Sequence, residues 1–216
     1  MKEINTPDGR RKVDHENAIV TSALQRLKDS SKANSFKVSL IYFSTRVIPD
    51  RDGERVYFPI HEAVQRYKDP VTVVGGEKTA IADAIDKAGS ILDGYNSDEG
   101  MPREKRATIL LFTDGLEVIR TRDAVVNSAR AAMSHPVCPA LATISFGKDA
   151  DEYLLRDIAS TANERQIRHL RNANVYQHLP DKQKLFLIGH DNDQVTEQKA
   201  IAIRNFVETL SMTALG

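Results

Sequence analysis

Two short segments of the chain carry side chains that suit a metal ion. The first is an apolar run, ATILLFT at residues 107–113, which is followed directly by Asp114 and Gly115. An aspartate after a buried strand stands at the tip of that strand, where its carboxylate can face a ligand. Hard divalent cations such as magnesium prefer oxygen ligands of this kind. The alternative is that Asp114 is an ordinary turn or helix-capping residue.

Thr79 is the second candidate ligand. It follows Gly75 and Gly76 at the start of a predicted helix, and glycines allow a backbone to approach a ligand closely. The threonine hydroxyl can coordinate a metal ion. It can also cap the helix by accepting a hydrogen bond from a backbone N–H group. Taken alone, the residue type favours the capping role.

The elements that position these residues are predicted to alternate between strands and helices. Residues 36–44, 107–113 and 140–146 are apolar on both parities, which is typical of strands buried on both faces, and we expect them to be adjacent or near-adjacent in one sheet. A last strand is predicted at residues 184–188. Apolar residues at helical spacing predict helices at residues 15–29, 79–92, 122–134, 152–159, 165–174 and 195–211.

This alternation indicates a doubly wound α/β fold with a mostly parallel sheet and helices on both faces. Ligands bind such sheets at the carboxyl ends of the strands. The Thr79 loop and the Asp114 turn are both expected there, so the sequence predicts one site that contains both residues.

Together and in this order, the segments resemble the von Willebrand factor type A (VWA) family. Residues 75–85, GGEKTAIADAI, are similar to the threonine loop of the family, and residues 109–115, ILLFTDG, to its Thr-Asp-Gly turn. Residues 36–44 resemble its second strand. Residues 143–147 and 154–159 resemble its fifth strand and the helix that follows.

The resemblance covers about residues 10–165 and implies the Rossmann-like VWA fold. We therefore expect a single domain over residues 1–216. In this domain, a C-terminal extension from about residue 166 to residue 216 adds the last strand and a closing helix.

The resemblance also implies a metal-ion-dependent adhesion site. Thr79 and Asp114 would be metal ligands in it, while Gly75, Gly76 and Gly115 would support the loops and the contact with a partner. The implied ion is Mg2+, with Mn2+ or Ca2+ as alternatives. A partner protein would offer an acidic side chain to that ion.

One part of the family pattern is missing. The sequence contains no Asp-x-Ser-x-Ser loop, and no strand precedes the first predicted helix. One explanation is that Met1 is the methionine that commonly follows this loop, so that the chain is truncated before it. The other is that residues 2–5 are a stub of the first strand, with Asn5, Pro7 and Gly9 at the ligand positions. In both cases two protein oxygen ligands remain, and we expect magnesium binding to be weak or absent.

Composition narrows the class of protein. Lys and Arg together number 30, as do Asp and Glu, and this balance disfavours a general nucleic-acid binder. The single cysteine, Cys138, allows neither an internal disulfide nor a cysteine-based zinc site. No apolar run approaches the ~20 residues of a membrane span. We therefore expect a cytoplasmic protein without nucleic-acid or membrane partners.

The predicted function is metal-dependent protein–protein interaction. No general base or nucleophile is evident beside the two candidate ligands, so we do not expect an enzyme. One alternative is a VWA-like scaffold that binds partners without metal. Another is a P-loop-like nucleotide-binding protein, because residues 76–79, GEKT, resemble the end of a phosphate-binding loop. Glu77 disfavours that alternative, since its carboxylate would face phosphate.

Overall fold

The computed structural model describes residues 12–74, 78–97, 106–113, 116–137, 140–146, 150–175, 181–188 and 197–213. Thr79 is among them. The other predicted site residues, Gly75, Gly76, Asp114 and Gly115, lie outside the described residues, so their roles stay predictions. Residues 1–11, on which the two explanations for the missing loop depend, also lie outside them.

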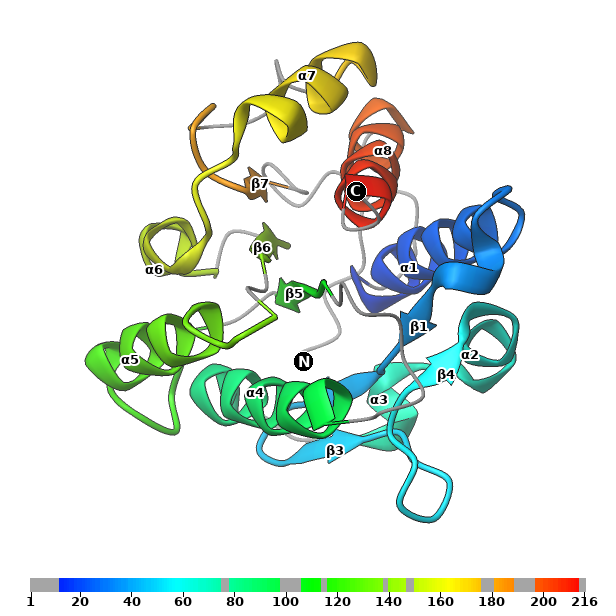
Figure 1. Ribbon diagram of the computed structural model, residues 1–216. Coiled ribbons are helices and arrows are strands. Elements are labelled where there is room, and N and C mark those ends of the chain that lie inside the picture. Colours follow the sequence, from blue (N-terminus) through cyan, green and yellow to red (C-terminus); the bar gives the residue numbers. More distant parts are fainter. Residues whose placement is uncertain are drawn as a thin grey trace.

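A parallel sheet of three strands lies at the centre of the fold (Figure 1). The strands, in their order across the sheet, are β5 (Thr108–Thr113), β6 (Ala140–Ser145) and β7 (Phe186–Ile188). Thr113 pairs with Ser145, and Ser145 pairs with Ile188, so the three strands end together at one edge. Strands were predicted at these three places, and the observed pairing confirms that they are parallel.

Helices cover both faces of this sheet (Figure 1). One face is covered by α4 (Ile81–Ser97), α5 (Arg122–Met133) and α6 (Glu152–Ile158), and the other by α1 (Lys12–Lys28), α7 (Glu164–Asn172) and α8 (Glu197–Thr213). Because side chains alternate along a strand, Leu141 packs with the first set of helices and Ile144 with the second. Both side chains are fully buried, and each such burial contributes about 1.5–3 kcal/mol.

Residues 36–44 differ from the expectation. They form two short strands, β1 (Lys37–Val38) and β2 (Ile41–Phe43), which pair antiparallel with β4 (Phe58–Pro59) and β3 (Val47–Pro49) respectively. The prediction of one long strand in the parallel sheet is therefore wrong for the described structure, and "mostly parallel" holds only for the central sheet.

The reason lies in a tight local turn. The Ser44 N–H group donates to the Arg46 carbonyl at 2.9 Å, and this turn brings β3 directly back onto β2. Further along, the Asp50 N–H group donates to the Leu40 carbonyl at 2.7 Å. A nearby strand thus satisfies the backbone of β2, and an apolar run does not reveal which partner a strand takes.

A third apolar cluster packs against the two antiparallel strand pairs. It joins α1, β2 and α2 (Ile60–Arg66), with Leu24, Tyr42 and Ile60 among its buried members. The short helix α3 (Pro70–Val73) follows, and a 3-10 turn, Ala33–Ser35, precedes β1.

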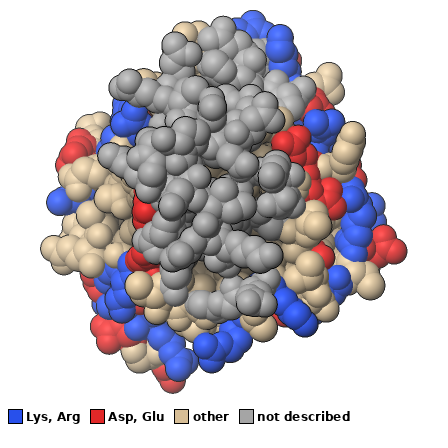
Figure 2. All heavy atoms as spheres, turned by 180° about the vertical axis from the view of Figure 1, so that it is seen from behind, with Lys and Arg blue, Asp and Glu red and all other residues tan. Residues whose placement is uncertain are grey.

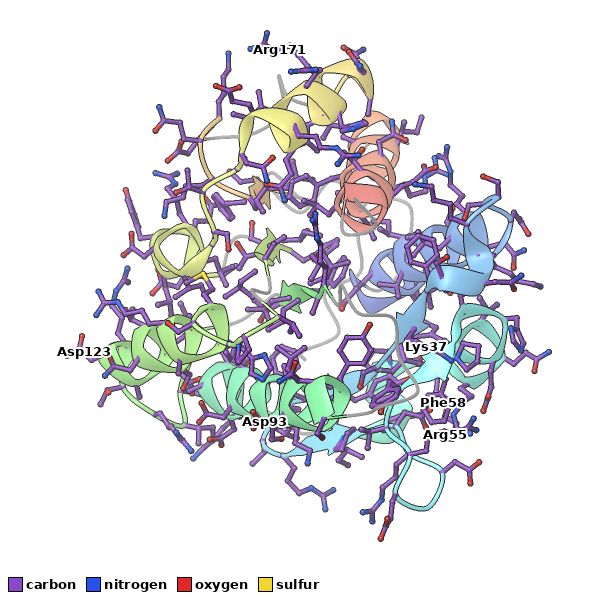
Figure 3. All side chains as sticks on the ribbon, viewed as in Figure 1. Lys37, Arg55, Phe58, Asp93, Asp123 and Arg171 are labelled. Atoms are coloured by element: carbon purple, nitrogen blue, oxygen red, sulfur yellow. The ribbon has the colours of Figure 1, made fainter. Side chains whose placement is uncertain are left out.

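Two arginines lie against the buried ring of Phe58, and Figure 3 labels one of them, Arg55, near this ring. The guanidinium carbon of Arg55 lies 4.7 Å from the ring centroid, and that of Arg66 lies 4.1 Å from it. Arg66 also forms an ion pair with Asp50. These contacts fix the loop between β3 and β4 against α2.

Charges of both signs are interspersed on the part of the surface that Figure 2 shows in colour, in agreement with the balanced composition. No helix within the described residues has the length and apolar character that crossing a membrane requires.

Candidate functional site

Three segments meet at the carboxyl end of the parallel sheet. The Ser44 hydroxyl, just after β2, donates to the Lys78 carbonyl at 3.1 Å. The Val118 N–H group, in the segment after β5, donates to the Thr79 carbonyl at 3.2 Å. Thr79 and Glu117 also form an isolated parallel bridge. We call this group of residues, Ser44, Lys78, Thr79, Glu117 and Val118, the carboxyl edge.

Thr79 is half-buried and lies two residues before the start of α4 at Ile81. Its backbone carbonyl is used in the contact with Val118. Within the described part of the chain, its hydroxyl has no hydrogen-bond partner, so Thr79 does not cap the helix there.

Glu117 caps α4, a role for which Thr79 was the candidate in the sequence. One carboxylate oxygen, Oε2, accepts a hydrogen bond from the Ala82 N–H group at 2.9 Å, in the first turn of α4. The other, Oε1, accepts from the N–H groups of Ile119 at 2.7 Å and Arg120 at 3.0 Å. A carboxylate is stabilised at a helix N-terminus because unpaired N–H groups and a partial positive charge are found there. Both oxygens of Glu117 are thus engaged by the backbone.

Sequence reasoning missed Glu117. Its contact with Ala82 spans 35 positions of the chain, and nothing local marks this glutamate as a cap. The only available signal was its place three residues after Asp114, in a segment already expected at the site.

Two arginines connect the helices around the carboxyl edge. Arg120 pairs with Asp83 and Asp86 on α4. Arg122, at the start of α5, pairs with Asp151 at 3.0 Å and with Asp157 on α6 at 2.8 Å. These side chains are partly exposed, so each pair contributes little alone. Their effect is to hold the starts of three helices in one arrangement.

A buried hydroxyl lies beside the end of β5. Ser145 is 1% exposed and pairs in register with Thr113, the last residue before Asp114. The Ser145 hydroxyl has no hydrogen-bond partner in the described structure. An unpaired buried polar group is costly, so this hydroxyl marks a place where the fold tolerates polarity at the end of the sheet.

The candidate groups at this edge carry oxygen atoms, the type of ligand atom that hard cations prefer. Thr79 carries a hydroxyl with no hydrogen-bond partner among the described residues, and Asp114 is expected to supply a carboxylate. The described residues contain no group of three or more His, Cys, Asp or Glu side chains that could hold a metal ion. The ligand roles of Thr79 and Asp114 at this edge stay predictions.

Comparisons with known proteins find similarity among solved structures. No protein-family model matches the chain, and no curated protein matches it. A similar solved structure is that of the manganese-loaded Plasmodium vivax TRAP protein, a VWA-domain protein, with a TM-score of 0.46 and 18% sequence identity. The match covers 68% of this chain and 57% of the TRAP chain, so it spans less than two thirds of the TRAP structure.

Proposed function

We propose that this chain is a VWA-type interaction module that binds a partner protein through a divalent metal ion at its carboxyl edge. The supporting observation is the hydrogen bond from the Val118 N–H group to the Thr79 carbonyl. Val118 lies four residues after Asp114, so the contact holds the two predicted ligand segments at the same edge of the sheet.

The proposed roles follow from the donor types. The Thr79 hydroxyl and the Asp114 carboxylate would hold the ion, which is Mg2+ or, alternatively, Mn2+ or Ca2+. Gly75, Gly76 and Gly115 would shape the loops around it. A bound ion supplies a positive charge and an open coordination position, and both attract an acidic side chain of the partner. The proposed role is binding without turnover.

A metal-independent scaffold is the second candidate, and Glu117 favours it. This carboxylate lies at the carboxyl edge, but backbone N–H groups already occupy both of its oxygens. The edge is therefore held together without any ion. A partner that needs only this preformed surface would bind equally well after metal removal.

Partner capture from a cell lysate in the presence of magnesium, with and without EDTA, separates the two candidates. Asp114→Ala is the test variant. Asp123→Ala is its matched control, since Asp123 is an exposed aspartate on α5 (Figure 3). We expect EDTA and Asp114→Ala to remove the same partners and Asp123→Ala to retain them. If EDTA and Asp114→Ala leave capture unchanged, the scaffold function replaces the metal-dependent one.

A further inference from the structure

Exposed apolar side chains concentrate just after the end of β5. The large apolar side chains exposed on the described residues are Leu116, Val118, Ile119, Tyr153 and Ile201. Three of these five lie within four consecutive residues: Leu116 and Val118 are each 50% exposed, and Ile119 is 38% exposed. Single exposed apolar residues are ordinary, whereas a cluster marks an interaction site. We call Leu116, Val118 and Ile119 the 116–119 patch.

The backbone that carries this patch is held on two sides. Glu117 fixes it through Ile119 and Arg120 and at the same time binds Ala82 at the start of α4. The Val118 N–H group is bound to the Thr79 carbonyl. These contacts hold the segment in the conformation that exposes its apolar side chains. A partner would therefore meet a preorganised surface and lose less entropy on binding.

Two exposed cations lie on segments that hydrogen bonds connect to the patch. Lys78 is exposed next to Thr79, and Arg46 is exposed two residues after Ser44, which contacts Lys78. Neither cation forms an ion pair within the described residues. Among the described residues that border the patch, Glu117 binds backbone N–H groups, and Asp83 and Asp86 pair with Arg120.

We infer that the 116–119 patch, together with Lys78 and Arg46, docks a peptide segment in which apolar side chains stand next to an acidic one. Charge complementarity selects the acidic residue, and the patch selects its apolar neighbours. The inference rests on the proposed function in taking the carboxyl edge as the partner-binding edge. The apolar and cationic contacts themselves need no metal ion.

A random peptide library displayed on phage and selected on the chain tests this inference. We expect the enriched sequences to carry Asp or Glu within two positions of Leu, Ile or Phe. The most enriched sequences are then synthesised with a fluorophore, and their affinity is measured by fluorescence anisotropy. Enrichment of sequences without an acidic residue beside apolar ones, or no enrichment at all, would overturn the inference.

Variants locate the binding surface. The double variant Val118→Ser, Ile119→Ser should weaken binding of the selected peptides by about tenfold or more, since docking would bury both apolar side chains. Ile201→Ser is the matched control because Ile201 is 40% exposed on α8. Lys78→Glu should weaken binding several-fold at low salt, whereas Lys37→Glu, on the exposed Lys37 of β1, should not. Equal effects of the patch and control variants would place the binding surface elsewhere.

The same titrations in EDTA distinguish this inference from the proposed function. If EDTA leaves peptide affinity unchanged while the patch variant weakens it, the docking surface stands and the metal-dependent function fails. If EDTA abolishes binding while the patch variant has no effect, the docking surface fails and the metal-dependent function stands.

Discussion

The Glu117 carboxylate accepts a hydrogen bond from the Ala82 N–H group at 2.9 Å, across 35 positions of the chain. It thereby joins the segment after β5 to the first turn of α4. The candidate ligand Thr79 lies between the glycine pair and that first turn. The position of Thr79 relative to the end of β5 thus depends on a residue that is not itself a candidate ligand.

Glu117→Ala should lower the free energy of unfolding by about 1–3 kcal/mol, because it removes the cap of α4 and two further hydrogen bonds to a charged group. Glu117→Gln should cost less, since the amide oxygen still accepts. Urea unfolding measures both effects. Glu54→Ala, at an exposed loop position, is the control and should change stability by less than about 0.5 kcal/mol. An Ala variant as stable as the wild type would show that Glu117 is not the cap.

Thr79→Ala should leave stability within about 0.5 kcal/mol of the wild type, because Glu117 rather than Thr79 caps the helix. It should nevertheless weaken metal-dependent partner capture. Thr79→Ser keeps the hydroxyl and should retain capture. Unfolding in urea and capture in magnesium are measured on both variants. If Ser and Ala weaken capture equally, the hydroxyl is not a ligand.

Alkaline stability should depend on Tyr67. Burial raises the pKa of Tyr67 well above its ordinary value of 10.0, and the nearby Glu16 raises it further. The folded state thus retains the phenol proton, so this stabilisation is present below about pH 10 and is lost as the pH rises above it. Tyr67→Phe should flatten the loss of stability between about pH 9 and pH 12.

The measurement is urea unfolding across that pH range. Tyr67→Phe should also cost about 0.5–1.5 kcal/mol near neutral pH, because the Tyr67 hydroxyl donates to the Asn17 side chain at 2.8 Å. Some slope should remain, since the pKa of Tyr42 is also raised by burial. Identical slopes for variant and wild type would contradict the assignment.

Ser145→Ala should stabilise the metal-free chain by up to about 1 kcal/mol, because it removes a buried hydroxyl that has no partner in the described structure. Thr143→Val is the opposite case on the same strand. The Thr143 hydroxyl donates to the Leu155 carbonyl at 2.9 Å, so its loss should cost about 1 kcal/mol. Thermal unfolding in EDTA checks both variants. Destabilisation by Ser145→Ala would indicate that the hydroxyl has a partner in solution.

The central part of the fold was predictable because its signals are local. The strands β5 and β6 are apolar on both parities, and the apolar spacing of α4 continues over several turns. Residues 36–44 carried the same signal, but their pairing was decided by the turn at Ser44 and by the nearness of β3. Apolarity predicts that a strand is buried, and it does not predict the partner.

The candidate site was predictable only in part. The threonine loop was expected near the end of β5, and the contact between Thr79 and Val118 confirms that these segments meet. Glu117, rather than Thr79, caps α4. Glu117 is distant from α4 in sequence, but the fold brings its carboxylate to the Ala82 N–H group. The ligand role of Asp114 stays a prediction.

The packing of α1 against α8 has a consequence for the order of folding. Arg26 on α1 pairs with Glu208 at 2.9 Å and donates to Asn205, 179 positions away on α8. Closing so long a loop is entropically costly and slow, whereas the contacts of α4 with α5 and of β5 with β6 join segments much closer in sequence. During synthesis, the apolar cluster that contains Ile19 and Ala23 cannot form completely until α8 has been made. We therefore expect the seam between these two helices to close last, and its hydrogen-exchange protection to appear after that of β5 and β6.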